Sequence, residues 1–267
     1  MRSFMDKKFN IMQMDCEERF GFASAGMTAA GKFSSLIPGI ILTALFYGVL
    51  SLLKTAFPAN DMIKMFFPYG EANRTFIPLI TVFAAMWCLS ALWIKKRKLS
   101  VQKKLVQALA GCADDDAREA FIAESVETPA AFAAVELFLQ KRRWEKRDLP
   151  AAETDTLLTS VAAEYEKASD TSFIFVSTLI WAVPVLGFIG TVLGLAKAVS
   201  KFGLLASAES HVSFESVLPQ LTGGLATAFE TTLIALILAL ILQILASCRR
   251  QAEEQFFGSL KTLIGSE

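Results

Sequence analysis

Four long apolar stretches divide this chain, and each is followed by polar or charged residues. Leu36–Leu53 contains no charge, and Phe76–Ile94 is apolar until four consecutive basic residues follow it. Two longer apolar stretches, 172–196 and 221–246, come late in the chain. At ~1.5 Å per residue, helices of these lengths can cross a hydrocarbon core of ~30 Å. The pattern predicts an all-α polytopic membrane protein with four transmembrane helices.

The charged sequence between the second and third apolar stretches predicts a helical domain outside the membrane. Apolar residues recur there at helical spacing, as at Leu105 and Leu109, and Gly111 and Pro150 mark breaks. Three helices joined by short loops fit this segment best. The predicted organisation is a cytoplasmic N-terminal segment with an interfacial start (1–35), a peripheral transmembrane hairpin (36–94), a cytoplasmic helical domain (95–171), a core transmembrane hairpin (172–247) and a cytoplasmic C-terminal tail (248–267).

The distribution of basic residues predicts the orientation in the membrane. All but five of the 26 lysines and arginines lie outside the two hairpins, so the positive-inside rule places both termini in the cytoplasm. We expect Lys95–Lys98 to anchor the second helix in the cytoplasmic lipid headgroups, and Arg249 and Arg250 to stop the last helix. The first helix is expected to act as the insertion signal, because the charged start of the chain does not resemble a signal peptide.

Composition narrows the functional classes. The hydrophobic share of 54% and a mean hydropathy of +0.46 exceed those of ordinary soluble domains. The net charge is zero, so no basic field favours nucleic acid as a partner. The four cysteines lack the spacing of a zinc site or a disulfide framework, and no common catalytic or nucleotide-binding motif occurs. The sequence therefore predicts neither an enzyme nor a metal site.

Small residues follow one face of each helix in the core hairpin. Gly187, Gly190 and Gly194 recur three and four positions apart, which opens room for another backbone. The last helix has a similar stripe, with Thr232 at its edge; it consists of Gly224, Ala228, Thr231, Ala235 and Ala239. We interpret both stripes as helix-packing seams.

Polar residues of the core hairpin share one depth. Thr191 and Thr232 would lie ~16 to 21 Å from the same membrane face, near the middle of the bilayer, and Glu230 would lie in the same layer. An ionisable residue at that depth is a functional-site hypothesis by default. A threonine in a membrane helix can equally donate to a carbonyl one turn back. For Glu230, which lies ~160° around the helix from Thr232, the alternatives are direct ion handling, bonding to a neighbouring subunit, pairing with Lys197, or facing a water-filled lumen.

A histidine, an acidic run and a basic run are interpreted as surface residues and not as functional sites. His211 is predicted to lie in a polar loop outside the membrane, and Asp114–Asp116 to lie in a solvated loop or at a helix start. The basic run Lys141–Arg147 is interpreted as a solvated or lipid-facing patch.

The core hairpin resembles the MotA/TolQ/ExbB family of ion-driven motor subunits. The resemblance is carried by PVLGFIGTVLGLAKAVSKF, from Pro184 to Phe202, together with GLATAFETTLIAL, from Gly224 to Leu236. The order of two helices, a large cytoplasmic insert and two more helices is also similar to the four-helix members. Glu230 departs from the pattern, because ExbB-like proteins usually carry an apolar residue there, and Lys197 is also atypical.

The resemblance implies a bacterial inner-membrane homo-oligomer, a ring of about five subunits. Such a ring would surround two copies of a single-span MotB/TolR/ExbD-like partner that carries an ion-binding aspartate. The transported ion would be H⁺ or Na⁺, with no bound cofactor. Thr191 and Thr232 match threonines thought to line the ion route, and the candidate ion-pathway set is Thr191, Thr231, Thr232 and Glu230. The candidate packing set is Pro184, Gly187, Gly190, Gly194, Gly224, Ala228 and Ala235.

The sequence leaves two alternatives to an ion-driven rotary motor. A non-conducting membrane scaffold of a secretion or envelope complex could use the same small-residue helices for assembly. A small-solute transporter is disfavoured, because the two halves of the chain show no repeat and no broken helix with a polar core.

Overall fold

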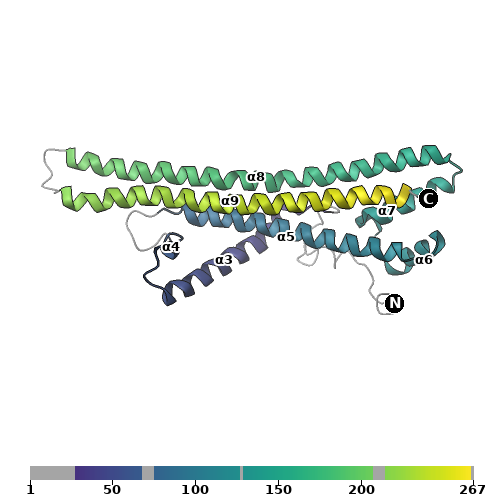
Figure 1. Cartoon of the computed structure of the whole chain (residues 1–267), viewed down its shortest axis with the longest axis horizontal. Coiled ribbons are helices and arrows are strands. Elements are labelled where there is room, and N and C mark those ends of the chain that lie inside the picture. Colours follow the sequence, from purple (N-terminus) through teal and green to yellow (C-terminus); the bar gives the residue numbers. More distant parts are fainter. Residues whose placement is uncertain (1–27, 68–74, 127–128, 207–213, 266–267) are drawn as a thin grey trace. The chain divides into compact units, whose positions relative to one another are not determined.

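The structure is a computed structural model that describes residues 28–67, 75–126, 129–206 and 214–265. All elements in these ranges are helices, as predicted (Figure 1). They are α3 (Lys32–Ala56), α4 (Asp61–Lys64), α5 (Ile77–Ala110), α6 (Asp115–Ser125), the 3₁₀ helix η2 (Pro129–Ala131), α7 (Ala133–Glu145), α8 (Ala151–Ala206) and α9 (Phe214–Gly265). Residues 1–27 of the predicted interfacial start (1–35) and the predicted loop position of His211 lie outside the described residues.

Four of these helices are long and apolar enough to cross a membrane, which confirms the predicted number of spans. They are α3, α5, α8 and α9, and each contains one of the four apolar stretches. The chain is therefore a multi-pass α-helical membrane protein.

Three of the four helices extend well beyond their apolar stretches. α5 continues through Lys95–Lys98 to Ala110, and α9 continues through Arg249 and Arg250 to Gly265. α8 begins at Ala151, far before its apolar stretch. Lysine and arginine are good helix formers, so a basic run can mark the membrane surface without ending a helix. The segment 95–171 is thus shared between the two separate helices α6 and α7 and the extensions of α5 and α8.

The ends of α5 and α8 coincide with a glycine and a proline, residues that interrupt helices. Gly111 follows the last residue of α5, and Pro150 directly precedes α8. Between α7 and α8, Asp148 adopts a left-handed conformation with φ 55°, which favours a turn. α3 begins at Lys32, earlier than predicted, so Pro38 lies beyond its first turn.

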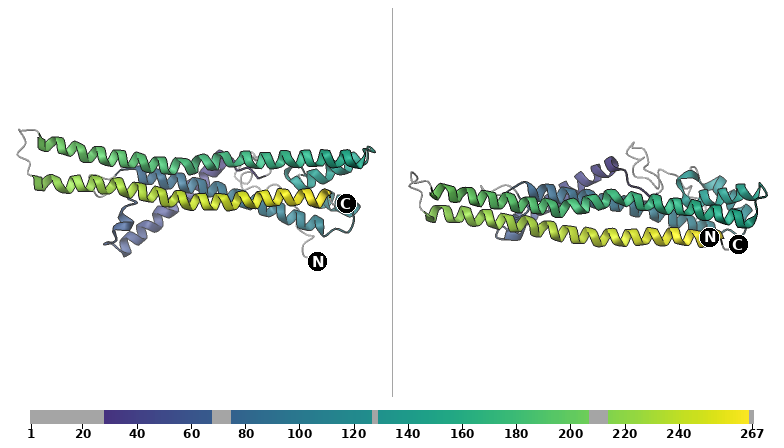
Figure 2. Two further views of the ribbon diagram at one scale, coloured as in Figure 1. Left: turned by 45° about the horizontal axis from the view of Figure 1, so that its top comes forward. Right: turned by 90° about the horizontal axis from the view of Figure 1, so that it is seen from above.

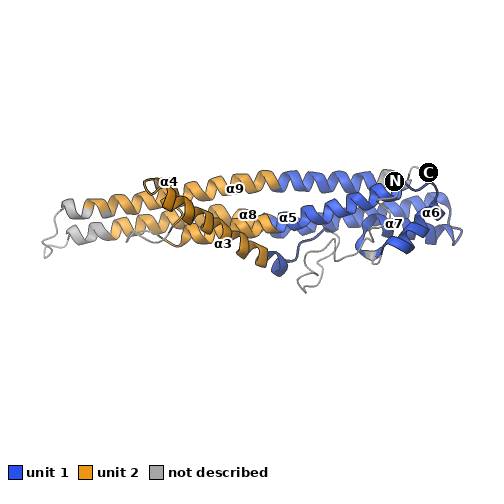
Figure 3. Cartoon of the chain, turned by 90° about the horizontal axis from the view of Figure 1, so that it is seen from below, with its two compact units in different colours: residues 1–35, 91–176, 246–267 blue, residues 36–90, 177–245 orange. Residues whose placement is uncertain are grey.

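The chain divides into two compact units (Figure 3). Unit 1 comprises residues 1–35, 91–176 and 246–267, and unit 2 comprises residues 36–90 and 177–245. The boundaries fall inside α3, α5, α8 and α9, so each of these helices contributes to both units.

Unit 1 has its own apolar core. Leu105 and Leu109 of α5 and Phe132–Val135 at the start of α7 are buried together with Leu158 of α8 and Phe257 of α9. Trp144 of α7 packs against this cluster. The helical spacing of Leu105 and Leu109 therefore identified one face of this core.

Unit 2 contains two close helix contacts. α8 and α9 run side by side in every view (Figure 2). α3 approaches α5 at Gly39, where an added Cβ would lie 2.9 Å from the Cα of Trp87. Only glycine admits that approach, because any side chain would overlap the backbone of α5.

Candidate functional site

The small-residue stripes of α8 and α9 face each other within unit 2. A Cβ added to Gly187 would lie 2.5 Å from the Cβ of Ala235, and one added to Gly194 would lie 2.8 Å from the Cβ of Ala228. A Cβ added to Gly224 would lie 3.2 Å from the Cβ of Ala198. A methyl group at Gly187 or Gly194 would overlap α9, and one at Gly224 would be tightly packed, so the backbones of α8 and α9 are in direct contact. We call this contact the α8–α9 seam.

Thr231 and Thr232 lie at the α8–α9 seam. Thr231 is 1% exposed and packs against Gly190, and its hydroxyl donates to the carbonyl of Ala228 at 2.9 Å. The hydroxyl of Thr232 donates across the seam to the carbonyl of Gly187 at 3.1 Å and lies 3.4 Å from the carbonyl of Ala228. The structure thus joins Thr232 to the glycine motif of α8.

Thr191 of α8 also donates its hydroxyl proton to a backbone carbonyl. Its hydroxyl donates to the carbonyl of Phe188 at 2.6 Å. The hydroxyl protons of Thr191, Thr231 and Thr232 are therefore directed to backbone carbonyls, a common use of threonine in membrane helices. A hydroxyl whose proton is donated in this way retains oxygen lone pairs as hydrogen-bond acceptors. Such oxygens could accept a proton from an acid or contact a cation.

The other two candidates occupy different surroundings. Glu230 precedes Thr231 on α9 and is half-buried, with the exposed side chain of Phe229 as its neighbour in sequence. Pro184 lies inside α8, three residues before Gly187. The structure brings Thr231 and Thr232 into contact with the glycines of α8.

A buried charged cluster, which sequence reasoning missed, lies in unit 1. Lys95 of α5 is 0% exposed and Glu253 of α9 is 1% exposed, and the Lys95 Nζ lies 3.2 Å from both carboxylate oxygens. Lys95 also donates to the Ser172 hydroxyl at 2.5 Å and to the Thr28 carbonyl at 3.3 Å. Ser169 donates to Glu253 at 2.5 Å. These contacts satisfy two charges that would otherwise be costly to bury.

Two more contacts complete this cluster. The Lys95 Nζ lies 4.0 Å from the ring centre of Phe173, a cation–π contact, and the buried Lys98 donates to the carbonyl of Ala29 at 2.6 Å. The predicted headgroup anchor at Lys95–Lys98 must therefore be revised, because two of its four side chains are buried in protein. Lys96 and Arg97 are exposed, and the Arg97 guanidinium lies 5.3 Å from the ring centre of Trp93.

Helical spacing could have indicated the two buried helix faces that carry this cluster, but not their contact. Lys95 and Lys98 are three residues apart and share a face with the buried Gln102, whereas Lys96 and Arg97 point elsewhere. On α9, Ala246, Glu253 and Leu260 recur every seven residues and are all buried. The run of four charges conceals this pattern unless each residue is placed by its position around the helix.

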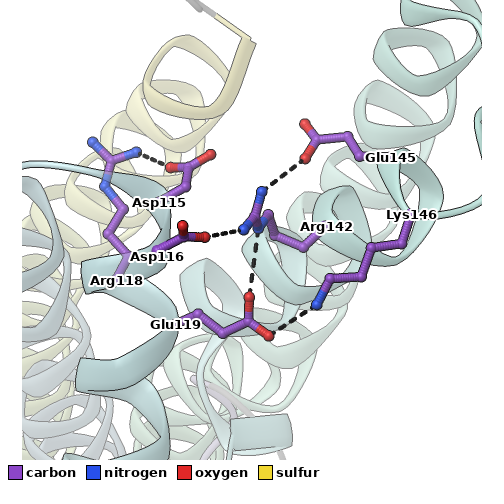
Figure 4. Close-up of polar contacts among 7 residues, drawn as sticks. All are labelled: Asp115, Asp116, Arg118, Glu119, Arg142, Glu145 and Lys146. Atoms are coloured by element: carbon purple, nitrogen blue, oxygen red, sulfur yellow. Dashed lines mark hydrogen bonds and ion pairs between the residues drawn. The ribbon is translucent and has the colours of Figure 1, made fainter.

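A surface network joins α6 to α7 (Figure 4). Arg142 contacts Asp116 at 2.5 Å and Glu119 at 3.6 Å, and Lys146 contacts Glu119 at 3.1 Å. The hydrogen bond from Lys146, with the charges of Lys146 and Arg142, holds the pKa of Glu119 below its usual value. The acidic and basic runs thus pair with each other, and within the described residues no group of His, Cys, Asp or Glu could hold a metal ion.

Taken together, these features define a polytopic helical membrane protein with a glycine-rich, threonine-bearing contact between its last two spans. The sequence profile of the MotA/TolQ/ExbB proton channel family matches residues 119–257. That match covers more than half of the chain, so the protein belongs to this family. The matched residues include Thr191, Thr231, Thr232 and Glu253, whereas Lys95 lies outside the match.

No curated protein and no solved structure matches the chain.

Proposed function

We propose that this chain is the ring-forming subunit of a proton- or sodium-driven rotary motor in a bacterial inner membrane, and not an enzyme. One observation carries the proposal. The region that matches a proton channel family contains an apolar seam where the Thr232 hydroxyl bonds the glycine motif of the neighbouring helix. A purely structural seam needs small residues, but hydroxyl oxygens in an apolar layer also provide acceptors for a moving proton or cation.

The proposed mechanism uses an acid supplied by a single-span partner. In its protonated form that acid is neutral and could pass the apolar surface beside Thr191 and Thr232 at little cost. In its charged form it would need water or a polar contact. Alternation between these states, driven by ion entry, would bias rotation of the ring around the partner.

A ring of about five subunits around two copies of the partner is the assembly that family membership favours. Both α8 and α9 carry large exposed apolar residues, such as Trp181, Phe188, Phe229 and Leu240. These faces suit lipid, neighbouring subunits and the partner helix. With both termini in the cytoplasm, the charged unit 1 lies on the cytoplasmic side. A count of subunits in images of the purified complex, with the central density, tests this assembly.

The ion route is tested by removing its hydroxyls. The Thr191→Val/Thr232→Val variant keeps side-chain shape and removes both hydroxyls. The chain would be co-produced with the product of a neighbouring gene that encodes one membrane span with an aspartate near its beginning. We expect proton or sodium flux into vesicles holding this complex to fall by at least about tenfold, a barrier change of about 1.4 kcal/mol.

Thr222→Val provides the matched control. Thr222 is exposed on the same helix, and its hydroxyl donates to the carbonyl of Leu218 at 3.0 Å within α9. Flux should be unchanged in that variant. Equal flux in the double variant and the control would refute the hydroxyl route and favour the non-conducting scaffold.

Glu230 is proposed as an ion-handling residue because it is a half-buried carboxyl in an apolar span that matches a proton channel family. Glu230→Gln keeps its size and removes its charge. Reduced flux with normal assembly supports ion handling, and unchanged flux assigns Glu230 a packing role.

A further inference from the structure

Residues 28–31 lead into α3 and lie outside any helix. They belong to unit 1, together with the parts of α5, α8 and α9 that hold the buried charged cluster. Thr28 is 3% exposed, and Ser35 in the first turn of α3 is 0% exposed. A buried segment without helical hydrogen bonds needs donors for its carbonyls from elsewhere in the protein. We call residues 28–31 the strap.

Two buried lysines of α5 supply these donors. Lys95 donates to the carbonyl of Thr28 at 3.3 Å, and Lys98 donates to the carbonyl of Ala29 at 2.6 Å. Both lysine residues are 0% exposed. A hydrogen bond from a charged donor is stronger than one between neutral groups, and burial strengthens it further. The backbone of the strap is therefore bound to α5 at two consecutive residues.

Glu253 of α9 joins the strap to the buried ion pair. The Thr28 hydroxyl donates to the Glu253 carboxylate, whose oxygen lies 3.2 Å from the Lys95 Nζ. Thr28 thus contacts both members of the pair, the cation through its carbonyl and the anion through its hydroxyl. Neither charged side chain can leave without breaking a hydrogen bond to the strap.

The charge on Glu253 retains Lys95 inside the protein. Lys98 repels this cation and Asp170 attracts it from farther away, whereas Glu253 attracts it and is in contact with it. A buried cation that loses its contacting anion is costly. A lysine side chain is long and flexible enough to turn to water instead, and the next residue, Lys96, is already exposed. The strap would then lose the donor to its first carbonyl.

We propose that the strap is a latch that the charge on Glu253 keeps closed. While Glu253 is ionised, Lys95 stays buried and the strap remains bound to α5 and α9. When Glu253 is neutral, Lys95 turns to water, and the strap opens together with the first turn of α3. The latch goes beyond the proposed ion route, because it lies in unit 1 and uses none of the threonines of the α8–α9 seam.

The latch can be measured by the rate at which a water-soluble maleimide labels a buried cysteine. All four native cysteines are replaced by alanine in the full chain, which is held in open membrane fragments. Ser35→Cys is the strap reporter, because Ser35 is 0% exposed and directly follows the strap in α3. Ser125→Cys is the body reporter; Ser125 is 6% exposed at the end of α6 in the same unit, so it reports general loosening of unit 1.

Two substitutions should open the latch selectively. We expect Glu253→Gln and Lys98→Met each to speed labelling of the strap reporter roughly tenfold or more, the effect of losing one hydrogen bond to a charged group. Labelling of the body reporter should not change. Thr28→Val keeps the carbonyl and removes only the hydroxyl, so we expect a smaller effect with the same selectivity. Lys96→Met is the matched control and should label as slowly as the chain that carries only the reporter.

Equal acceleration at both reporters would indicate general loosening and would overturn the proposal. Fast labelling of the strap reporter without any further substitution would overturn it too, and so would unchanged labelling in every variant. A selective rise with Lys98→Met alone would refute control by the charge on Glu253. Thr28→Val tests the contact with Glu253 if Glu253→Gln fails to accumulate in membranes. No readout involves ion flux, so the outcome is separate from that of the proposed motor function.

Discussion

Removal of the Lys95 cation should destabilise the protein severely, and removal of its partner as well should restore much of the loss. Lys95→Met leaves the Glu253 carboxylate buried, with hydrogen bonds from Ser169 and Thr28 but without its cation. Breaking a buried pair in this way typically costs ~3–5 kcal/mol. In Lys95→Met/Glu253→Gln neither member of the pair carries a charge, and the glutamine amide oxygen can still accept from Ser169. We therefore expect the double variant to recover ~2 kcal/mol or more of that loss.

The assay is denaturant unfolding in mild detergent, followed by helical circular dichroism and by the fluorescence of Trp144, which packs on the unit 1 core. Lys96→Met is the matched control, because Lys96 is the exposed neighbour of Lys95. That change should stay within ~0.5 kcal/mol. The reasoning is refuted if Lys95→Met costs no more than Lys96→Met, or if the second substitution restores nothing.

Two further predictions concern the seam and the surface network. Gly194→Ala should lower the free energy of unfolding by ~1–3 kcal/mol, because the added Cβ would lie 2.8 Å from the Cβ of Ala228. In Gly258→Ala the added Cβ meets nothing within 4 Å, so this control should raise the free energy of unfolding by ~0.5–1 kcal/mol. Equal effects of the two substitutions in the same unfolding assay would contradict the tight seam. The pKa of Glu119 is depressed in the folded state, so its contribution is fully present above the unfolded value of ~4.3 and is lost as pH falls through the lower folded value. Lys146→Met should weaken this acid dependence of unfolding, and an unchanged pH profile would argue against the Lys146–Glu119 contact.

The length of the apolar stretches predicted the spans well and the ends of their helices poorly. The four apolar stretches all lie in long helices, because apolar length alone determines what can cross a bilayer. The same argument could not predict that α5 continues to Ala110 and α9 to Gly265. A change from apolar to charged sequence marks a change of solvent, and a helix continues through it unless glycine or proline intervenes.

The candidate site was foreseen only in part. The stripe containing Gly187, Gly190 and Gly194 indicated close packing, and the structure identifies α9 as the helix in contact. The placement of Thr232 at the edge of its stripe is consistent with its bond to Gly187 across the seam. No pattern along the sequence indicated that Lys95 would meet Glu253, 158 residues away.

The sequence by itself determined which segments lie in lipid and which in water, that the spans are helices, and that a small-residue seam is present. These properties depend on hydrophobicity and on spacing within one helix. The tertiary structure decided which polar groups meet. Lys95, Ser169 and Glu253 come from three different helices, and each is unremarkable in its own segment. Their burial became favourable only when packing supplied the opposite charge and the hydroxyl donor together, and that pairing is a property of three-dimensional contact.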